Sequence, residues 1–243
     1  MQTENIKSFK RLYVTVKKLL GEVESFTPGN TNEQLVQQVV EHTDTMIALL
    51  PFEFPTASLQ YAKARILLVD IANPDAEPQE IVEKGQGYTR VSTPANTDIL
   101  YESTIMAVLE NWKFTAWNYF VHFSADGPLK EKYISIVMEH AVQYMERFPF
   151  SNYWEQWEKD MYVLYANQFG YFTGEREKDP QKLEAALAIV DKAFPHCDWT
   201  RLVFLKSTKV TLLLKLNRPW EAYSIVKEGL AKKPNYDEFQ KFK

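Results

Sequence analysis

Apolar residues recur every three or four positions along most of this chain, a spacing that places their side chains on one face of an α-helix. In the first three quarters of the sequence this pattern predicts helices over 6–20, 35–50, 59–69, 96–123, 129–147 and 151–170. A break is expected within the fourth of these, near Asn111. The hydrophobic pattern therefore indicates an all-α protein.

The twelve prolines all fall outside these segments, because proline cannot continue a helix and turns the preceding residue away from helical geometry. Three prolines and two glycines gather in residues 73–95, which predicts a long connection. This connection is the best candidate for a sub-boundary. The expected organisation is otherwise one helical array over 1–243.

Aromatic side chains are concentrated in residues 112–172, which hold 18 of the 34 in the chain. Within the helix predicted over 151–170, Tyr153 and Tyr162 fall on opposite faces, so we expect that helix to lie between neighbours. Two interpretations of the aromatic segment stay open. It fills the interior of a helical protein, or it forms a binding surface or pocket, whose candidate lining is Trp112, Trp117, Tyr153 and Trp157.

An internal repeat marks the C-terminal quarter. The pattern Ala186-x-x-Ile-Val-x-x-Ala-Phe194 matches Ala222-x-x-Ile-Val-x-x-Gly-Leu230 with every position displaced by 36 residues. Self-similarity at a period of 20 to 50 residues is typical of a solenoid, in which each unit buries its apolar face by stacking on the next. In the second copy, a turn at 217–219 separates two predicted helices.

The second copy resembles the tetratricopeptide repeat (TPR) family, with Glu-Ala at the start of its second helix, a small residue seven positions on, and Pro-Asn-Tyr after it. The likeness covers 199–236 closely and 151–198 loosely. Lys206, Lys209 and Val210 depart from the family pattern, and an acidic insertion at 173–179 interrupts the upstream copy. The resemblance implies antiparallel helical hairpins stacked as a short right-handed α-solenoid, with the TPR-like repeats over 151–243.

The same resemblance implies that the first helix of each pair lines a groove for a peptide or partner helix. Position by position, it assigns Phe204, Ser207, Thr211 and Lys215 to that groove. Their spacing of three or four residues agrees with one helical face. A packing role for Phe204 against a neighbouring helix is the alternative.

Composition and charge narrow the function classes. Apolar runs such as 66–72 and 210–216 are too short to cross a bilayer, and no secretory leader pattern is present, so we expect a cytoplasmic protein without a membrane span. The first 20 residues carry five Lys or Arg against one Glu, but the formal net charge is −4, which does not favour nucleic acid as a partner.

No sequence motif points to chemistry. The four histidines lack the helical spacing of a zinc site, and Cys197 is the only cysteine, so neither metal nor cofactor is expected. Phosphate-binding and nucleophile-elbow motifs are missing from the sequence. We therefore expect a non-catalytic interaction module that holds a protein or peptide partner, with Lys215 facing an acidic group, as in an adaptor or an inhibitor or immunity protein. The alternative is an enzyme or small-ligand binder with its pocket in residues 112–172.

Overall fold

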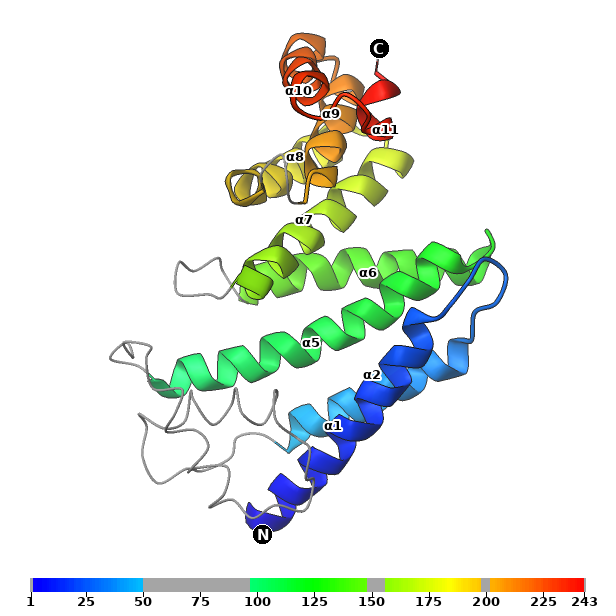
Figure 1. The fold of residues 1–243 in the computed structure, drawn as a ribbon, viewed down its shortest axis with the longest axis vertical. Coiled ribbons are helices and arrows are strands. Elements are labelled where there is room, and N and C mark those ends of the chain that lie inside the picture. The colour runs from blue at the N-terminus through cyan, green and yellow to red at the C-terminus, as the bar shows by residue number, and fades with distance from the viewer. Residues whose placement is uncertain (1, 50–96, 148–155, 198–201, 243) are drawn as a thin grey trace. The chain divides into compact units, whose positions relative to one another are not determined.

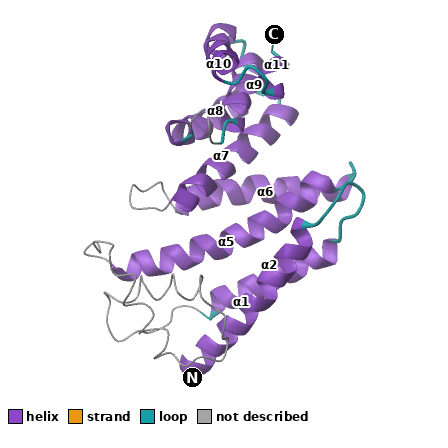
Figure 2. Ribbon diagram, viewed as in Figure 1, coloured by secondary structure: helices purple, strands orange, loops and turns teal. Residues whose placement is uncertain are grey.

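The computed structural model describes residues 2–49, 97–147, 156–197 and 202–242. Within these ranges the regular elements are helices, and Figures 1 and 2 show them joined by turns, with no strand. A single isolated bridge between Thr27 and Asn30 closes one of those turns. The all-α prediction is confirmed, whereas the helix expected over 59–69 and the connection 73–95 lie outside the described residues.

Contacts divide the chain into two compact units, Met1–Tyr133 and Ile134–Lys243. Helix α6 (Pro128–Arg147) contributes residues to both of them. Each unit is described by itself below.

Unit 1 is built on α1 (Gln2–Glu24), α2 (Glu33–Ala48) and α5 (Thr97–Phe123), and each of these helices contacts the other two. Asn32 begins α2 by accepting the Leu35 N–H at its side-chain oxygen, the usual role of Asn at this position. Lys113 of α5 ties α5 to α2 through a 2.9 Å ion pair with Asp44. Buried apolar side chains fill the space between the helices, among them Phe9, Val16, Val23, Val36, Val39, Met46 and Phe114.

Helix α5 runs without interruption from Thr97 to Phe123, so the break expected near Asn111 is wrong. Asparagine is only a modest helix former, and its cost in a helix is a fraction of a kcal/mol. On either side of it, Leu109 and Phe114 have no exposed surface. Burying these two side chains contributes several times more than the propensity costs, so tertiary contact decides the conformation.

Unit 2 contains two successive helical pairs. The first is α7 (Gln156–Arg176) with α8 (Pro180–Ala193), followed by a short 3₁₀ turn, η1 (Phe194–His196). The second is α9 (Phe204–Lys215) with α10 (Pro219–Lys232), followed by the four-residue α11 (Asp237–Gln240). Helix α9 contacts both α7 and α8, so the second pair rests on the first.

Gly170 is a point of close approach between helices in this unit. A Cβ atom there would lie 2.5 Å from Val190 Cγ2 on α8 and 2.9 Å from Thr208 Cγ2 on α9, distances that real side chains do not adopt. The residue therefore allows three helices to meet. The sequence prediction ended a helix at Gly170 and placed an insertion at 173–179. Both are wrong, because α7 continues to Arg176 and only residues 177–179 form the turn.

Helix α7 is buried on more than one side, as the distribution of its apolar residues predicts. The Tyr165 ring of α7 stacks on the Tyr144 ring of α6, with the ring centroids 4.0 Å apart and an angle of 4° between the ring planes. On another side, the Thr208 hydroxyl of α9 donates a 2.7 Å hydrogen bond to the Asn167 side-chain oxygen, and both residues are buried. Of the aromatic-rich segment, the described part is thus mostly interior, with Tyr171 as an exposed exception at 48%.

The two pairs share one design but not the register that the sequence repeat indicates. Helices α8 and α10 both have 14 residues and both begin with proline, at Pro180 and Pro219, which are 39 residues apart. If the two helices are aligned by the 36-residue sequence match instead, α10 moves by about one helical turn relative to α8. In either register, the inward stripe of α10 at Ala222, Val226 and Gly229 corresponds to buried residues of α8.

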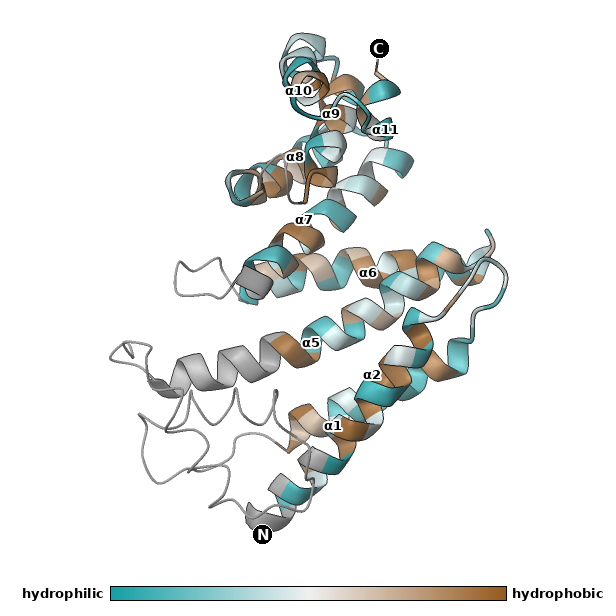
Figure 3. Ribbon diagram, in the orientation of Figure 1, coloured by the Kyte–Doolittle hydropathy of each residue, from teal (hydrophilic) through white to brown (hydrophobic). Residues whose placement is uncertain are grey.

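Hydrophobic and hydrophilic residues are mixed along each of α1, α2 and α6, as the colouring of Figure 3 shows. None of the helices in the described ranges is both long enough and apolar enough to span a bilayer.

Candidate functional site

The candidate site is an open hollow of about 600 Å³ in unit 2, formed by α9, α10 and the residues after α11. We call it the C-terminal hollow. Its lining residues are Val210, Leu214, Pro219, Trp220, Ala222, Tyr223, Val226, Lys241 and Phe242. Eight of these nine side chains are apolar or aromatic, so the hollow offers contact area and little polar chemistry.

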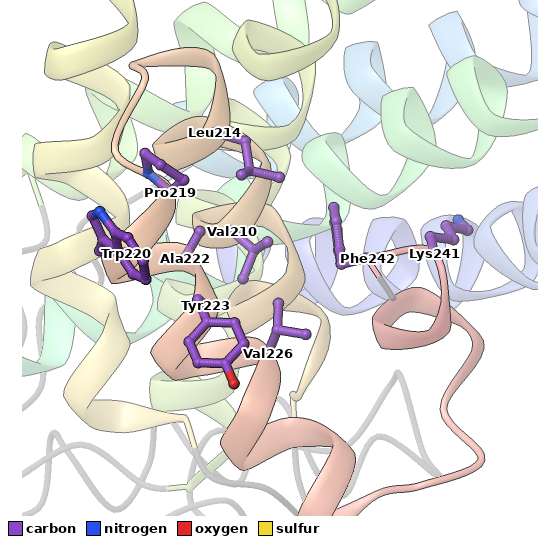
Figure 4. Close-up of a pocket in the computed structure, with 9 residues that line it drawn as sticks. All are labelled: Val210, Leu214, Pro219, Trp220, Ala222, Tyr223, Val226, Lys241 and Phe242. Atoms are coloured by element: carbon purple, nitrogen blue, oxygen red, sulfur yellow. The ribbon is translucent and has the colours of Figure 1, made fainter.

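Large apolar side chains stand exposed at its edge. Trp220 is 83% exposed, Tyr223 is 57% exposed and Leu214 is 44% exposed. In Figure 4, Trp220 and Tyr223 project from the same side of α10, and Phe242 stands across the hollow from them. Grouped exposed side chains of this size are uncommon on a monomer and mark interaction sites.

Helix geometry explains why these aromatic side chains are outside. The inward stripe of α10 is made of small or medium residues, with Ala222 1% exposed and Val226 6% exposed. Trp220 and Tyr223 are three residues apart, so they share a second face of the helix that is rotated away from this stripe. Pro219 at the first helical position fixes where that face begins.

On the side of the hollow away from α10, the lining residues follow α11, which is anchored by Phe239. The Phe239 side chain has no exposed surface. Its ring lies against Gly229 so closely that a Cβ on that residue would be 2.9 Å from Phe239 Cδ2. Gly229, which has no side chain, therefore leaves room for this ring. Phe239 thereby holds α11 in place, and Lys241 and Phe242, the two residues after α11, lie at the edge of the hollow.

Acidic residues of α10 are engaged by basic neighbours. The Arg218 guanidinium donates to both carboxylate oxygens of Glu221, at 2.6 and 2.7 Å, and this interaction lowers the pKa of Glu221. Lys232 pairs with Glu228 at 3.0 Å. Lys241 is the charged residue among the nine that line the hollow.

The predicted groove residues lie on α9 but differ in exposure. Ser207 is 6% exposed, and the Thr211 hydroxyl donates to the Ser207 carbonyl at 3.2 Å. Phe204 is partly exposed and Lys215 is exposed. None of the four lines the C-terminal hollow, although Lys215 follows the lining residue Leu214 directly.

The predicted aromatic pocket is only partly described. Trp112 is 7% exposed and meets Tyr13 edge-on, with ring centroids 5.0 Å apart. Trp117 is partly exposed, and the Lys113 ammonium lies 5.8 Å from its ring centroid. Tyr153 and the side chain of Trp157 lie outside the described residues.

A second group of charged side chains surrounds Phe194, at the end of α8. The ammonium groups of Lys206 and Lys209 lie 4.2 and 4.3 Å from its ring centroid. Lys209 also pairs with Asp191 of α8 at 2.7 Å. Cation–π contact and an ion pair thus join α8 to α9, which is a structural role.

The sequence did not single out Trp220 and Tyr223. The signal that could have found them is their position: two aromatic residues three apart, off the inward stripe Ala222–Val226–Gly229. In the register set by the helix starts, α8 has polar Gln181 and Glu184 at these positions.

Within the described ranges, no group of His, Cys, Asp and Glu is arranged to hold a metal ion. The thiol of Cys197 is buried and donates to the Phe194 carbonyl at 3.2 Å. Compared with known proteins, the chain matches no family model, no curated protein and no solved structure.

Proposed function

We propose that this chain is a non-catalytic interaction module that binds a protein or peptide partner at the C-terminal hollow. The observation that carries the proposal is the exposure of Trp220, 83%, at the edge of an apolar hollow of about 600 Å³. Interface residues that dominate binding are most often Trp, Tyr and Arg beside a pocket that excludes water. Tyr223 and Leu214 extend this surface.

The proposed architecture is a short right-handed, TPR-like solenoid in which the pairs α7–α8 and α9–α10 are successive units. It is supported by the shared helix length, the proline at the start of each second helix, and the position of α9 against both α7 and α8. In this proposal the chain is a cytoplasmic adaptor or inhibitor. The residues assigned to the groove by resemblance remain a second, separate contact surface, of which Lys215 is the most accessible.

The proposal is tested by quantitative affinity capture with the wild-type chain and the double variant Trp220→Ala, Tyr223→Ala. We expect a protein partner in near-stoichiometric amount with the wild type and at least tenfold less with the double variant, since two such truncations typically remove more than 1.4 kcal/mol of binding. Circular dichroism of both proteins should be the same, because the two side chains are exposed.

Tyr171→Ala is the matched control, because Tyr171 is an exposed aromatic residue of the same unit that does not line the hollow. Its capture should equal that of the wild type. Equal recovery with the double variant would remove the hollow as the site. Recovery of a metabolite, with no protein partner, would refute the interaction function itself.

A further inference from the structure

We propose that the occupant of the C-terminal hollow is an amphipathic α-helix of a partner protein that carries acidic residues beside its apolar stripe. This inference rests on the proposed function and adds the chemistry of the partner. It follows from two independent observations, the exposed apolar side chains beside α10 and the charge around the hollow.

The comparison of α8 with α10 indicates a helical occupant. The inward stripe of α8, which includes Leu183, Leu187 and Val190, is buried to 2% exposure or less, and α8 contacts a helix of its own pair, α7, and one of the next pair, α9. Among the described helices, the main contacts of α10 are with α9 and with the four-residue α11. In the first pair, α8 is thus covered by the 12-residue helix α9, whereas in the second pair α10 is covered by the much shorter α11.

The hollow lies between α9, the start of α10 and the residues after α11. Ala222 and Val226 line it but are 1% and 6% exposed, so the apolar surface left uncovered is that of Leu214, Trp220 and Tyr223. Side chains spaced by three or four residues on a partner helix can fill such a surface, as they do in other helix-in-groove complexes. Trp220 and Tyr223 on one side and Phe242 on the other would flank that helix (Figure 4).

The positive charge around the hollow indicates that the partner helix carries acidic residues beside its apolar stripe. Residues 204–243 carry nine Lys or Arg and four Asp or Glu, a formal charge of +5 in a chain whose net charge is −4. Lys241 lines the hollow, and Lys227 is exposed one helical turn after Tyr223. In a symmetric dimer this surface would face the same surface of a second copy, and the like charges would repel each other. An acidic helix would be attracted to it.

The test is a selection of displayed random 18-residue peptides on the purified full-length wild-type chain. Peptides that also bind the Trp220→Ala, Tyr223→Ala variant are removed. We expect the enriched peptides to place apolar residues at i, i+3 or i+4, and i+7, and to hold about twice as many Asp and Glu as the starting library. Enriched peptides without helical spacing, or without an acidic excess, would overturn the inference, as would a selection that enriches nothing.

A pair of charge-reversed proteins separates local attraction from net charge. Lys227→Glu with Lys241→Glu changes the hollow, and Lys178→Glu with Lys192→Glu makes the same net change at exposed sites elsewhere in unit 2. We expect the first double variant to bind the selected acidic peptides about tenfold more weakly and the second to change affinity less than twofold, as measured by calorimetry. Equal losses would refute a local basic edge.

The remaining outcomes distinguish this inference from the proposed function. If the captured cellular partner depends on Trp220 but has no acidic amphipathic helix, the function stands and the inference fails. If sedimentation shows a concentration-dependent dimer that the Trp220→Ala, Tyr223→Ala variant loses, a second copy is the occupant, and the inference fails. If capture of the cellular partner does not depend on these residues, both fail.

Discussion

Gly170 and Gly174 lie one turn apart on α7, and alanine at the two positions is expected to change stability in opposite directions. Replacing glycine by alanine inside a helix normally stabilises it by up to about 1 kcal/mol, because glycine loses more backbone entropy on folding. At Gly174 the new methyl group would lie 3.5 Å from Thr211 Cγ2 and 3.6 Å from Leu212 Cδ2, which is ordinary contact. The full gain should therefore appear there.

At Gly170 the same methyl group would lie 2.5 Å from Val190 Cγ2 and 2.9 Å from Thr208 Cγ2. Both neighbours are β-branched and sit in helices, where rotation about the first side-chain bond is restricted, most strongly for valine. Overpacking of this kind costs about 1–3 kcal/mol, which exceeds the gain in helix propensity. We expect Gly170→Ala to destabilise the protein by about 1–2 kcal/mol.

Urea denaturation followed by far-ultraviolet circular dichroism measures both effects as changes in the free energy of unfolding. Val190→Ala removes a fully buried side chain and should cost less in the Gly170→Ala background than in the wild type, with a coupling free energy of about 0.5–3 kcal/mol between the two sites. Stabilisation by Gly170→Ala, or the absence of coupling to position 190, would show that the three helices do not meet as closely as described.

Two further predictions concern buried polar groups. Thr208→Val should cost about 1–3 kcal/mol in urea denaturation, because it leaves the buried Asn167 oxygen without its 2.7 Å donor, whereas Thr211→Val, which loses a bond within its own helix, should cost less than about 0.5 kcal/mol. A similar cost for both would contradict the role given to the Asn167 pair. Burial, and then the 3.1 Å hydrogen bond to Glu33, raise the pKa of Tyr133 to about 12, so the folded protein keeps this proton after the unfolded chain loses it near pH 10. The stability difference between wild type and Tyr133→Phe should therefore be constant below pH 10 and shrink as the pH rises toward 12, and a difference that does not change over that window would refute the shift.

Local pattern predicted the existence of the helices, because their apolar stripes and flanking prolines are properties of short segments. Their ends at Asn111 and Gly170 could not be predicted in this way. At Asn111 the deciding contribution is burial of Leu109 and Phe114. At Gly170 it is close approach to Val190, a residue 20 positions away in sequence. A glycine that ends a helix and one that admits a neighbouring helix look the same in a single sequence.

The candidate site was harder to predict than the fold. The resemblance directed attention to one face of residues 204–215, where Ser207 proved to be buried. Exposure of Trp220 depends on how α10 is rotated against α9, and the 36-residue match gave a register one turn away from that of the helix starts. Which aromatic residues face outward is thus a property of the packed pairs.

The contact between Gly229 and Phe239 has a consequence for tracing the ancestry of this chain. A side chain at 229 would overlap the present position of the ring at 239, so the ring would have to shift or be replaced by a smaller side chain. Related sequences should show glycine at the first whenever they show a ring at the second, and should lose both at once. A covarying pair ten positions apart, behind a proline-started helix, can identify distant members of the lineage after overall similarity has faded.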